Sequence, residues 1–287
     1  MQSVNELNRS ARSASSYQKI QQIAANVKAI SLVDALKVGS IWTESSKTDK
    51  SVDVGHVDQA FVCYLIPGIT CSNWTEKCLA SCFGDSVTGT YTLKSKASQM
   101  AMARRTALAL YYSAEFTQRA VSDLLSKIKP GTRIVSVRLN GTSDYTFGGV
   151  RFAIRQALRN VGVDCVFYEY TKNWNLVHNL EPYFTDDSGT KSVQVFFSLS
   201  AHEHVSTEAI KLALSKGINV AVPILVPKSK TYQKPLWWKG FPSIDGDKHD
   251  YLPAHPKGVI ILLGYKNQSK TAAQSATGFI QPVESGV

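Results

Sequence analysis

Apolar and polar positions alternate along most of the chain in the pattern of strands that are separated by helices. Several short runs are almost continuously apolar, as in strands that are covered on both faces. Six strands are predicted, over residues 60–67, 133–139, 164–170, 192–199, 219–226 and 258–265. Helical spacing of apolar residues predicts a long stretch over 94–129, divided into two helices near Ser113, and shorter helices over 150–160, 175–180 and 206–216.

Strands that alternate with helices predict a parallel sheet with right-handed crossovers. This part of the chain is shorter than the ~250 residues of a full (β/α)8 barrel. We therefore expect an α/β protein with a partial (β/α)6 TIM-like barrel of mostly parallel strands over residues 58–287, and an open doubly wound sheet is the alternative. Residues 1–57 carry an imperfect helical stripe followed by polar sequence, which predicts an N-terminal helical extension and a linker.

Composition limits the environment and the partners of the chain. With 287 residues, 44% of them hydrophobic, it can build a full core, and no apolar run approaches the ~18 residues of a membrane span. The polar N-terminus has no apolar signal segment, and five cysteines, an odd number, argue against a disulfide framework. We expect a cytoplasmic protein without a membrane partner. The net charge of +10 favours nucleic acid or a phosphorylated substrate, with a merely soluble basic surface as the alternative.

Three cysteines lie close together after the first predicted strand: Cys71, Cys78 and Cys82. Thiolates packed this closely can hold an iron–sulfur cluster or a zinc ion, or form a redox pair. Buried thiols without a ligand are the alternative, because the last two cysteines have the i, i+4 spacing of one helix face. Zinc would need a fourth ligand. Four residues are candidates for it: Cys63, His202, His204 and His249.

Polar residues follow the predicted strands, where (β/α) barrels carry their chemistry. Asp144 can accept a hydrogen bond from the amino group of a cofactor or from a substrate hydroxyl, and Lys172 can meet a phosphate or a carboxylate. Asp247 and His249, in the acidic segment 245–250, have the chemistry of a proton-transfer or hard-cation site. We predict catalytic roles for these four residues, and helix caps, solvated charges or a polar turn are the alternatives.

Basic residues form two candidate nucleic-acid surfaces. Arg151, Arg155 and Arg159 recur every four residues, which places them on one helix face. The segment 228–239 interleaves lysines with aromatic residues, the combination that binds single-stranded nucleic acid. Its candidate contacts are Lys230, Lys234, Trp237 and Trp238. The alternative is a surface loop whose tryptophans fold back onto the protein.

From about residue 58 to 283 the chain resembles the gene product 88-like family, phage and prophage proteins with a three-cysteine loop. The resemblance rests on the motif Gly-x-Thr-Cys-x6-Cys-x3-Cys-Phe over residues 68–83 and on six further blocks in the same order. These blocks cover residues 137–144, 167–172, 197–200, 219–222, 244–250 and 277–279. More distantly, the cysteine loop and the six βα units are similar to radical S-adenosylmethionine enzymes.

The second resemblance implies a cofactor and its ligands. Cys71, Cys78 and Cys82 would hold a [4Fe–4S] cluster with one open iron. S-adenosylmethionine would be contacted through its methionyl part by Asn140, Gly141, Ser143 and Asp144. The chain departs from the usual pattern in the wider cysteine spacing and in Phe83, which follows the last cysteine where the family has an aromatic residue before it.

The motifs and these resemblances lead to three functional hypotheses, of which the third is a barrel that has lost its cofactor and serves as an interaction module. The first is a phage-type iron–sulfur protein that acts by radical chemistry on a nucleic acid or a nucleotide, in the host cytoplasm if the chain is phage-encoded. The alternative is a non-catalytic protein, binding single-stranded nucleic acid or associated with replication, with a structural zinc site.

Overall fold

The computed structural model describes residues 14–43, 50, 52, 55–75, 78, 96–174, 183–185, 191–199, 207–226, 232–249, 251–265 and 280–281. Several predicted features lie outside these residues: Cys82, Lys230, His202, His204 and the helix over 175–180.

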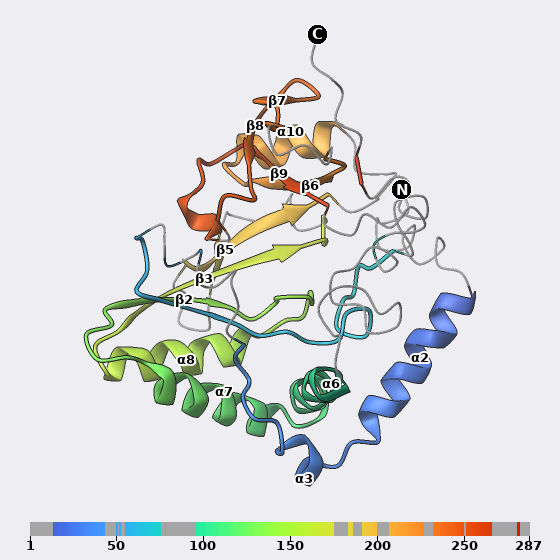
Figure 1. The fold of residues 1–287 in the computed structure, drawn as a ribbon, viewed down its shortest axis with the longest axis vertical. Helices are drawn as coiled ribbons and strands as arrows, with labels where there is room; N and C mark the ends of the chain where they lie inside the picture. Colours follow the sequence, from blue (N-terminus) through green and yellow to red (C-terminus); the bar gives the residue numbers. More distant parts are fainter. Residues whose placement is uncertain are drawn as a thin grey trace.

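A single sheet runs through the molecule (Figure 1). Its strands are β1 (Gln59–Val62), β2 (Ile134–Arg138), β3 (Asp164–Thr171), β4 (Tyr183–Thr185), β5 (Lys191–Ser198), β6 (Val220–Ile224), β7 (Trp237–Trp238), β8 (Phe241–Asp245) and β9 (Ile260–Gly264). They pair in the order β1-β2-β3-β5-β6-β9-β8-β7, and β4 pairs with β5 outside this path. All pairs from β1 to β8 along the path are parallel, whereas β4 and β7 are antiparallel to their partners.

The described helices are α2 (Ala14–Lys28), α3 (Leu32–Ala35), α6 (Lys96–Tyr111), α7 (Ser113–Lys127), α8 (Gly148–Asn160), α10 (Thr207–Ser215) and the short 3-10 helix η1 (Leu252–Ala254). The long predicted helical stretch is divided at Tyr112, next to the predicted position. All six predicted strands are present, as β1, β2, β3, β5, β6 and β9.

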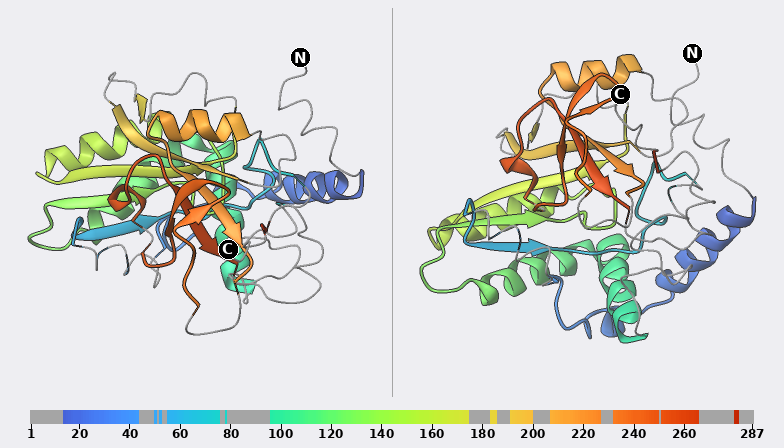
Figure 2. Two further views of the ribbon diagram at one scale, coloured as in Figure 1. Left: turned by 90° about the horizontal axis from the view of Figure 1, so that it is seen from above. Right: turned by 45° about the horizontal axis from the view of Figure 1, so that its top comes forward.

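One face of the sheet carries the longer helices. Side chains of α7 and α8 pack on Val137, Phe167 and Val193, which are neighbours across three adjacent strands. On the same face, α10 packs on Phe197 and Val220. The α7–α8 pair and α10 nevertheless flank the sheet from opposite sides of the molecule (Figure 2), so the sheet curves between them.

The predicted α/β class and the mostly parallel sheet are confirmed. From β1 to β9 the sequential strands β1, β2, β3, β5, β6 and β9 lie side by side without a reversal, so the described sheet is singly wound and lacks the switch point of a doubly wound sheet. The sheet is open, with β1 and β7 at the two ends of the described path. The described strands therefore do not close into a barrel.

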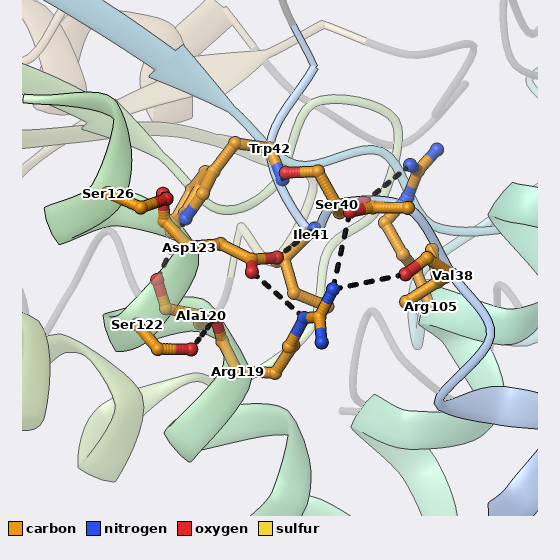
Figure 3. A network of polar contacts seen from close by, with 11 residues as sticks. Val38, Ser40, Ile41, Trp42, Arg105, Arg119, Ala120, Ser122, Asp123 and Ser126 are labelled. Atoms are coloured by element: carbon orange, nitrogen blue, oxygen red, sulfur yellow. Dashed lines mark hydrogen bonds and ion pairs between the residues drawn. The ribbon is translucent and has the colours of Figure 1, made fainter.

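The predicted N-terminal extension is helical over α2 and α3, and its described part packs into the main core. Val27, Val38 and Trp42 belong to the same buried cluster as Phe61 of β1. Residues 38–42 are also fastened by polar contacts (Figure 3). Asp123 of α7 accepts a hydrogen bond from the backbone N–H of Ile41 at 2.9 Å and pairs with Arg119 at 2.8 Å. The indole of Trp42 donates to the carbonyl of Ala120 at 2.8 Å.

Candidate functional site

The carboxyl ends of β1 and β2 bring the cysteine loop and the predicted cofactor segment together. Cys71 and Asp144 form a parallel β-bridge, and the backbone N–H of Asp144 donates to the carbonyl of Thr70 at 3.1 Å. The hydroxyl of Thr142 donates to the carbonyl of Leu65 at 2.6 Å. The two segments are adjacent because the carboxyl ends of parallel neighbours lie at the same edge of a sheet.

The end of β3 adds two charged residues to this group, Lys172 and Glu169. The side chain of Asp144 accepts hydrogen bonds from the backbone N–H of Lys172 at 3.0 Å and from the hydroxyl of Thr171 at 3.3 Å. Burial raises the pKa of the Asp144 carboxyl, and the positive charge of Lys172 opposes this shift. We call Cys71, Cys78, residues 140–144, Glu169 and residues 171–172 the strand-end site.

Cys71 and Cys78 are both buried. Burial raises the pKa of the Cys71 thiol to about 11, against the opposing charge of Lys172. A thiol with this pKa carries its proton at neutral pH. A metal ion would have to replace the proton, as metals do when they bind cysteine.

The donor chemistry of the two described thiols fits a soft metal or an iron–sulfur cluster. Within the described residues, no three side chains of His, Cys, Asp and Glu are grouped as around a metal ion. The third predicted thiol ligand, Cys82, lies outside those residues. Cys63 packs in the core with Phe61 and Leu65, and burial raises its pKa to about 12, so it does not complete the site.

A buried network of polar side chains supports residues 140–144, the predicted cofactor segment. Glu169 of β3 pairs with Arg151 of α8 at 2.5 Å and accepts a hydrogen bond from the side-chain amide of Asn140 at 2.6 Å. Asn140 in turn accepts from the hydroxyl of Ser143 at 2.6 Å. Glu169 was not among the predicted site residues. The available signal was a single charge within the otherwise apolar and aromatic run Phe167–Tyr170.

Gly141 has a structural reason to be glycine. Its backbone N–H donates to the carbonyl of Cys63 at 2.9 Å. A Cβ atom at this position would lie 2.7 Å from that carbonyl oxygen and 2.6 Å from the ring of Tyr64. The close backbone approach of the predicted cofactor segment to the chain after β1 therefore requires glycine here.

The acidic segment after β8 forms a separate cluster. The buried ammonium of Lys234 contacts Asp245, Asp247 at 2.5 Å and the carbonyl of Leu262 at 3.0 Å. These contacts use all three of its donors. Lys234 is therefore not presented to a nucleic acid, and Asp247 is engaged in an internal ion pair. His249 stacks on His255 with ring centroids 4.4 Å apart. Two strands, β5 and β6, lie between this cluster and the strand-end site.

Burial also removes most of the predicted nucleic-acid contacts from the surface. Arg151 is paired with Glu169, and the guanidinium of Arg155 lies over the ring of Phe167, 5.4 Å from its centroid. Both arginines are buried, whereas Arg159 is exposed. Of the two predicted tryptophans, Trp238 is buried and Trp237 is 65% exposed. The helical spacing is as predicted, but the arginine face is turned largely toward the sheet.

The fold and the strand-end site together define a singly wound α/β protein with cysteines at the carboxyl edge of its sheet. The family model of gene product 88 matches residues 36–282, and the chain belongs to this phage-type family. The match begins at residue 36, directly after α3, and therefore earlier than the start at about residue 58 that the motifs suggested. No curated protein and no solved structure matches the chain, and these comparisons give no support to the resemblance to radical S-adenosylmethionine enzymes.

Among the helices that the structure describes, none has both the length and the apolar character of a membrane span.

Proposed function

We propose that this gene product 88 protein is an iron–sulfur enzyme, built on a partial (β/α)6 barrel, that acts by radical chemistry on a nucleotide or a nucleic acid. The observation that carries the proposal is the contact between the cysteine loop and the end of β2, where Cys71 pairs with Asp144. The singly wound strand order and the curvature of the sheet support the partial barrel. The edge that carries the cysteines is the one at which (β/α) barrels place their chemistry.

The residues of the strand-end site would divide the work as follows. Cys71, Cys78 and Cys82 would be the thiolate ligands. A [4Fe–4S] cluster bound in this way supplies an electron to a small cofactor such as S-adenosylmethionine. The carboxyl group of Asp144 can accept from an amino group of that cofactor, and Lys172 supplies positive charge beside thiolates and an anionic substrate. The buried positions of Cys71 and Cys78 limit the access of water to these two thiols.

The test is the iron, sulfide and zinc content of protein purified without oxygen, together with its visible spectrum. The proposal predicts about four irons and four sulfides per chain, with loss of both in Cys71→Ser. Cys165→Ser is the matched control, because this cysteine lies in β3 outside the strand-end site and should leave the content unchanged. Protein without iron and sulfide would overturn the proposal.

The second candidate is a protein that binds single-stranded nucleic acid and carries a structural zinc. The observation that favours it is the β7–β8 hairpin. Lys239 and Gly240 both have positive φ, 47° and 80°, as in the tight two-residue turns that hold hairpins rigid. This hairpin presents Trp237, with Leu236 beside it at 76% exposure. An exposed aromatic side chain suits a stacked base.

This candidate predicts zinc without sulfide and salt-sensitive binding of a fluorescent oligothymidine. Trp237→Ala should weaken that binding by about 1–3 kcal/mol, the usual range for one stacked base. Leu236→Ala is the control for a general loss of hairpin apolar surface. Equal binding by the wild type and Trp237→Ala would exclude this surface.

A further inference from the structure

Glu169 is a buried carboxylate whose two oxygens are both engaged. It lies in β3 and is only 4% exposed. One oxygen, Oε1, accepts from Nε and Nη2 of Arg151 at 3.1 and 2.5 Å, and the other, Oε2, accepts from the amide nitrogen of Asn140 at 2.6 Å. The pair thus joins α8, β3 and the end of β2.

The charge of Glu169 decides how Asn140 is oriented. An ionised carboxylate can only accept hydrogen bonds, so the Nδ2 amide of Asn140 must face it. The Oδ1 oxygen of Asn140 is thereby turned to the loop, where it accepts from the hydroxyl of Ser143 at 2.6 Å and from the backbone N–H of Tyr145 at 3.0 Å. Nδ2 also donates to the carbonyl of Tyr145 at 2.9 Å. Both ends of the amide therefore close the loop over residues 140–145.

That loop in turn holds the cysteine loop. Asp144 bridges to Cys71, and the hydroxyl of Thr142 donates to the carbonyl of Leu65. The thiol of Cys71 lies 3.8 Å from the carbonyl of Thr142. An unbroken series of contacts leads from Arg151 through Glu169 and Asn140 to Cys71.

Stability alone does not explain why Arg151 and Glu169 form a buried ion pair. A buried ion pair pays a large desolvation cost, and an apolar pair of similar volume is often as stable or more stable. What an apolar pair cannot do is fix the orientation of an amide group, because it offers no acceptor. The ion pair is therefore better explained by the geometry that it imposes on the loop.

We propose that Glu169, held by Arg151, is a positioning residue that sets the 140–144 segment and thereby the place of Cys71 in the strand-end site. A role of Glu169 in cofactor chemistry rests on the proposed function, whereas its effect on the position of Cys71 does not. The position of Cys71 is therefore tested on metal-free protein, and the absence of iron from the purified protein would not affect this test.

The measurement is the alkylation rate of Cys71 by iodoacetamide, followed by peptide mass spectrometry, with Cys63 and Cys165 as internal references. Buried thiols react through local opening, so the rate reports how firmly the loop is held. In Glu169→Gln, which removes the charge that orients Asn140, we expect Cys71 to react several-fold faster and the two reference thiols to react at unchanged rates. Asp164→Asn, which also replaces a carboxylate by an amide but at an exposed position of β3, is the matched control and should leave the rates of Cys71 and Cys63 unchanged; Cys165 adjoins the substituted residue and is not used as a reference in this variant.

The double variant Arg151→Met/Glu169→Leu separates positioning from packing. It removes both charges together and fills their space with apolar side chains. A positioning role predicts that its thermal unfolding returns to that of the wild type while Cys71 stays reactive. If the double variant restores the protection of Cys71 along with the stability, the pair serves only to fill space and the proposal fails. If Glu169→Gln speeds the alkylation of all three thiols equally, the single variant has lost overall stability, and the double variant then decides between positioning and packing.

Discussion

Arg151, Arg155 and Lys234 show how little the net charge of a chain says about its surface. Each is a basic residue whose side chain is buried against a carboxylate or an aromatic ring. A charge without such a partner would cost several kcal/mol in the interior. These three basic side chains are therefore engaged inside the fold, and an anionic partner has to be argued from the basic residues that are exposed.

The close backbone approach at Gly141 can be tested by the addition of one methyl group. Gly141→Ala places a methyl group against the carbonyl oxygen of Cys63, which as backbone cannot move away easily. We expect a loss of about 1–3 kcal/mol in the free energy of unfolding, the usual cost of overpacking, measured by urea denaturation. Gly149→Ala is the control, because its methyl group would meet no atom within 4 Å and alanine favours a helix. Equal stabilities of the two variants would contradict the close approach.

The hydrogen bonds of Asp58 at the start of β2 predict that the stability of the fold depends on pH. Its carboxylate accepts from the backbone N–H groups of Arg133 at 2.7 Å and Ile134 at 3.0 Å, and these bonds lower its pKa below the ordinary value of 3.8. A carboxyl group with a lowered pKa in the folded state stabilises the fold above its ordinary pKa, and this contribution disappears as the pH falls through the lowered value. Asp58→Asn should therefore be less stable than the wild type at pH 7, and the difference should shrink below about pH 3.8. A difference that stays constant from pH 7 to pH 2.5, in urea denaturation, would refute this assignment.

At the scale of elements, the apolar runs predicted the strands, and parallel order predicted which strand ends meet. Cys71 and Asp144 could be placed together on this basis, since both follow strands that pair. The network through Glu169 could not, because it depends on how α8 is rotated over β3. The short strands β7 and β8 were missed because Pro242 and the turn at Gly240 interrupt the alternation. A continuous apolar run predicts a strand from the sequence alone, whereas a short strand can be recognised only once the strand that it pairs with is known.

The carboxylate of Asp123 in α7 is one of the polar groups that hold the segment before β1. In Asp123→Ala, the backbone N–H of Ile41 and the guanidinium of Arg119 lose an acceptor (Figure 3). We expect a loss of about 1–3 kcal/mol, because a buried donor is left unsatisfied, and faster hydrogen exchange of the Ile41 amide. Ser126→Ala is the control on the next turn, since the hydroxyl of Ser126 bonds only within α7 among the described contacts. Unchanged exchange at Ile41 would show that the other contacts of residues 38–42 hold the segment without Asp123.

At the scale of the whole molecule, the N-terminal helices and the sheet share one core. Five of the residues before position 58 that belong to the main buried cluster are at most 3% exposed: Val27, Ala35, Val38, Ile41 and Trp42. The family match also begins before this position, at residue 36. The boundary at residue 57 was predicted from a change in polarity along the chain and stays a prediction, and the shared core bears on whether residues 58–287 fold without the N-terminal helices.

A chain that starts at residue 58 should therefore not fold cooperatively. Removal of the five side chains uncovers the apolar partners that they bury, a loss on the order of 10 kcal/mol, comparable with the whole stability of a typical domain, about 5–15 kcal/mol. We expect such a chain to lose its near-ultraviolet circular dichroism and to unfold without a sharp transition in urea. Addition of residues 14–57 as a separate peptide should restore part of the signal, because the same contacts can form between two chains. Cooperative unfolding of the shortened chain by itself would show instead that residues 58–287 are an independent domain to which the N-terminal helices are only attached.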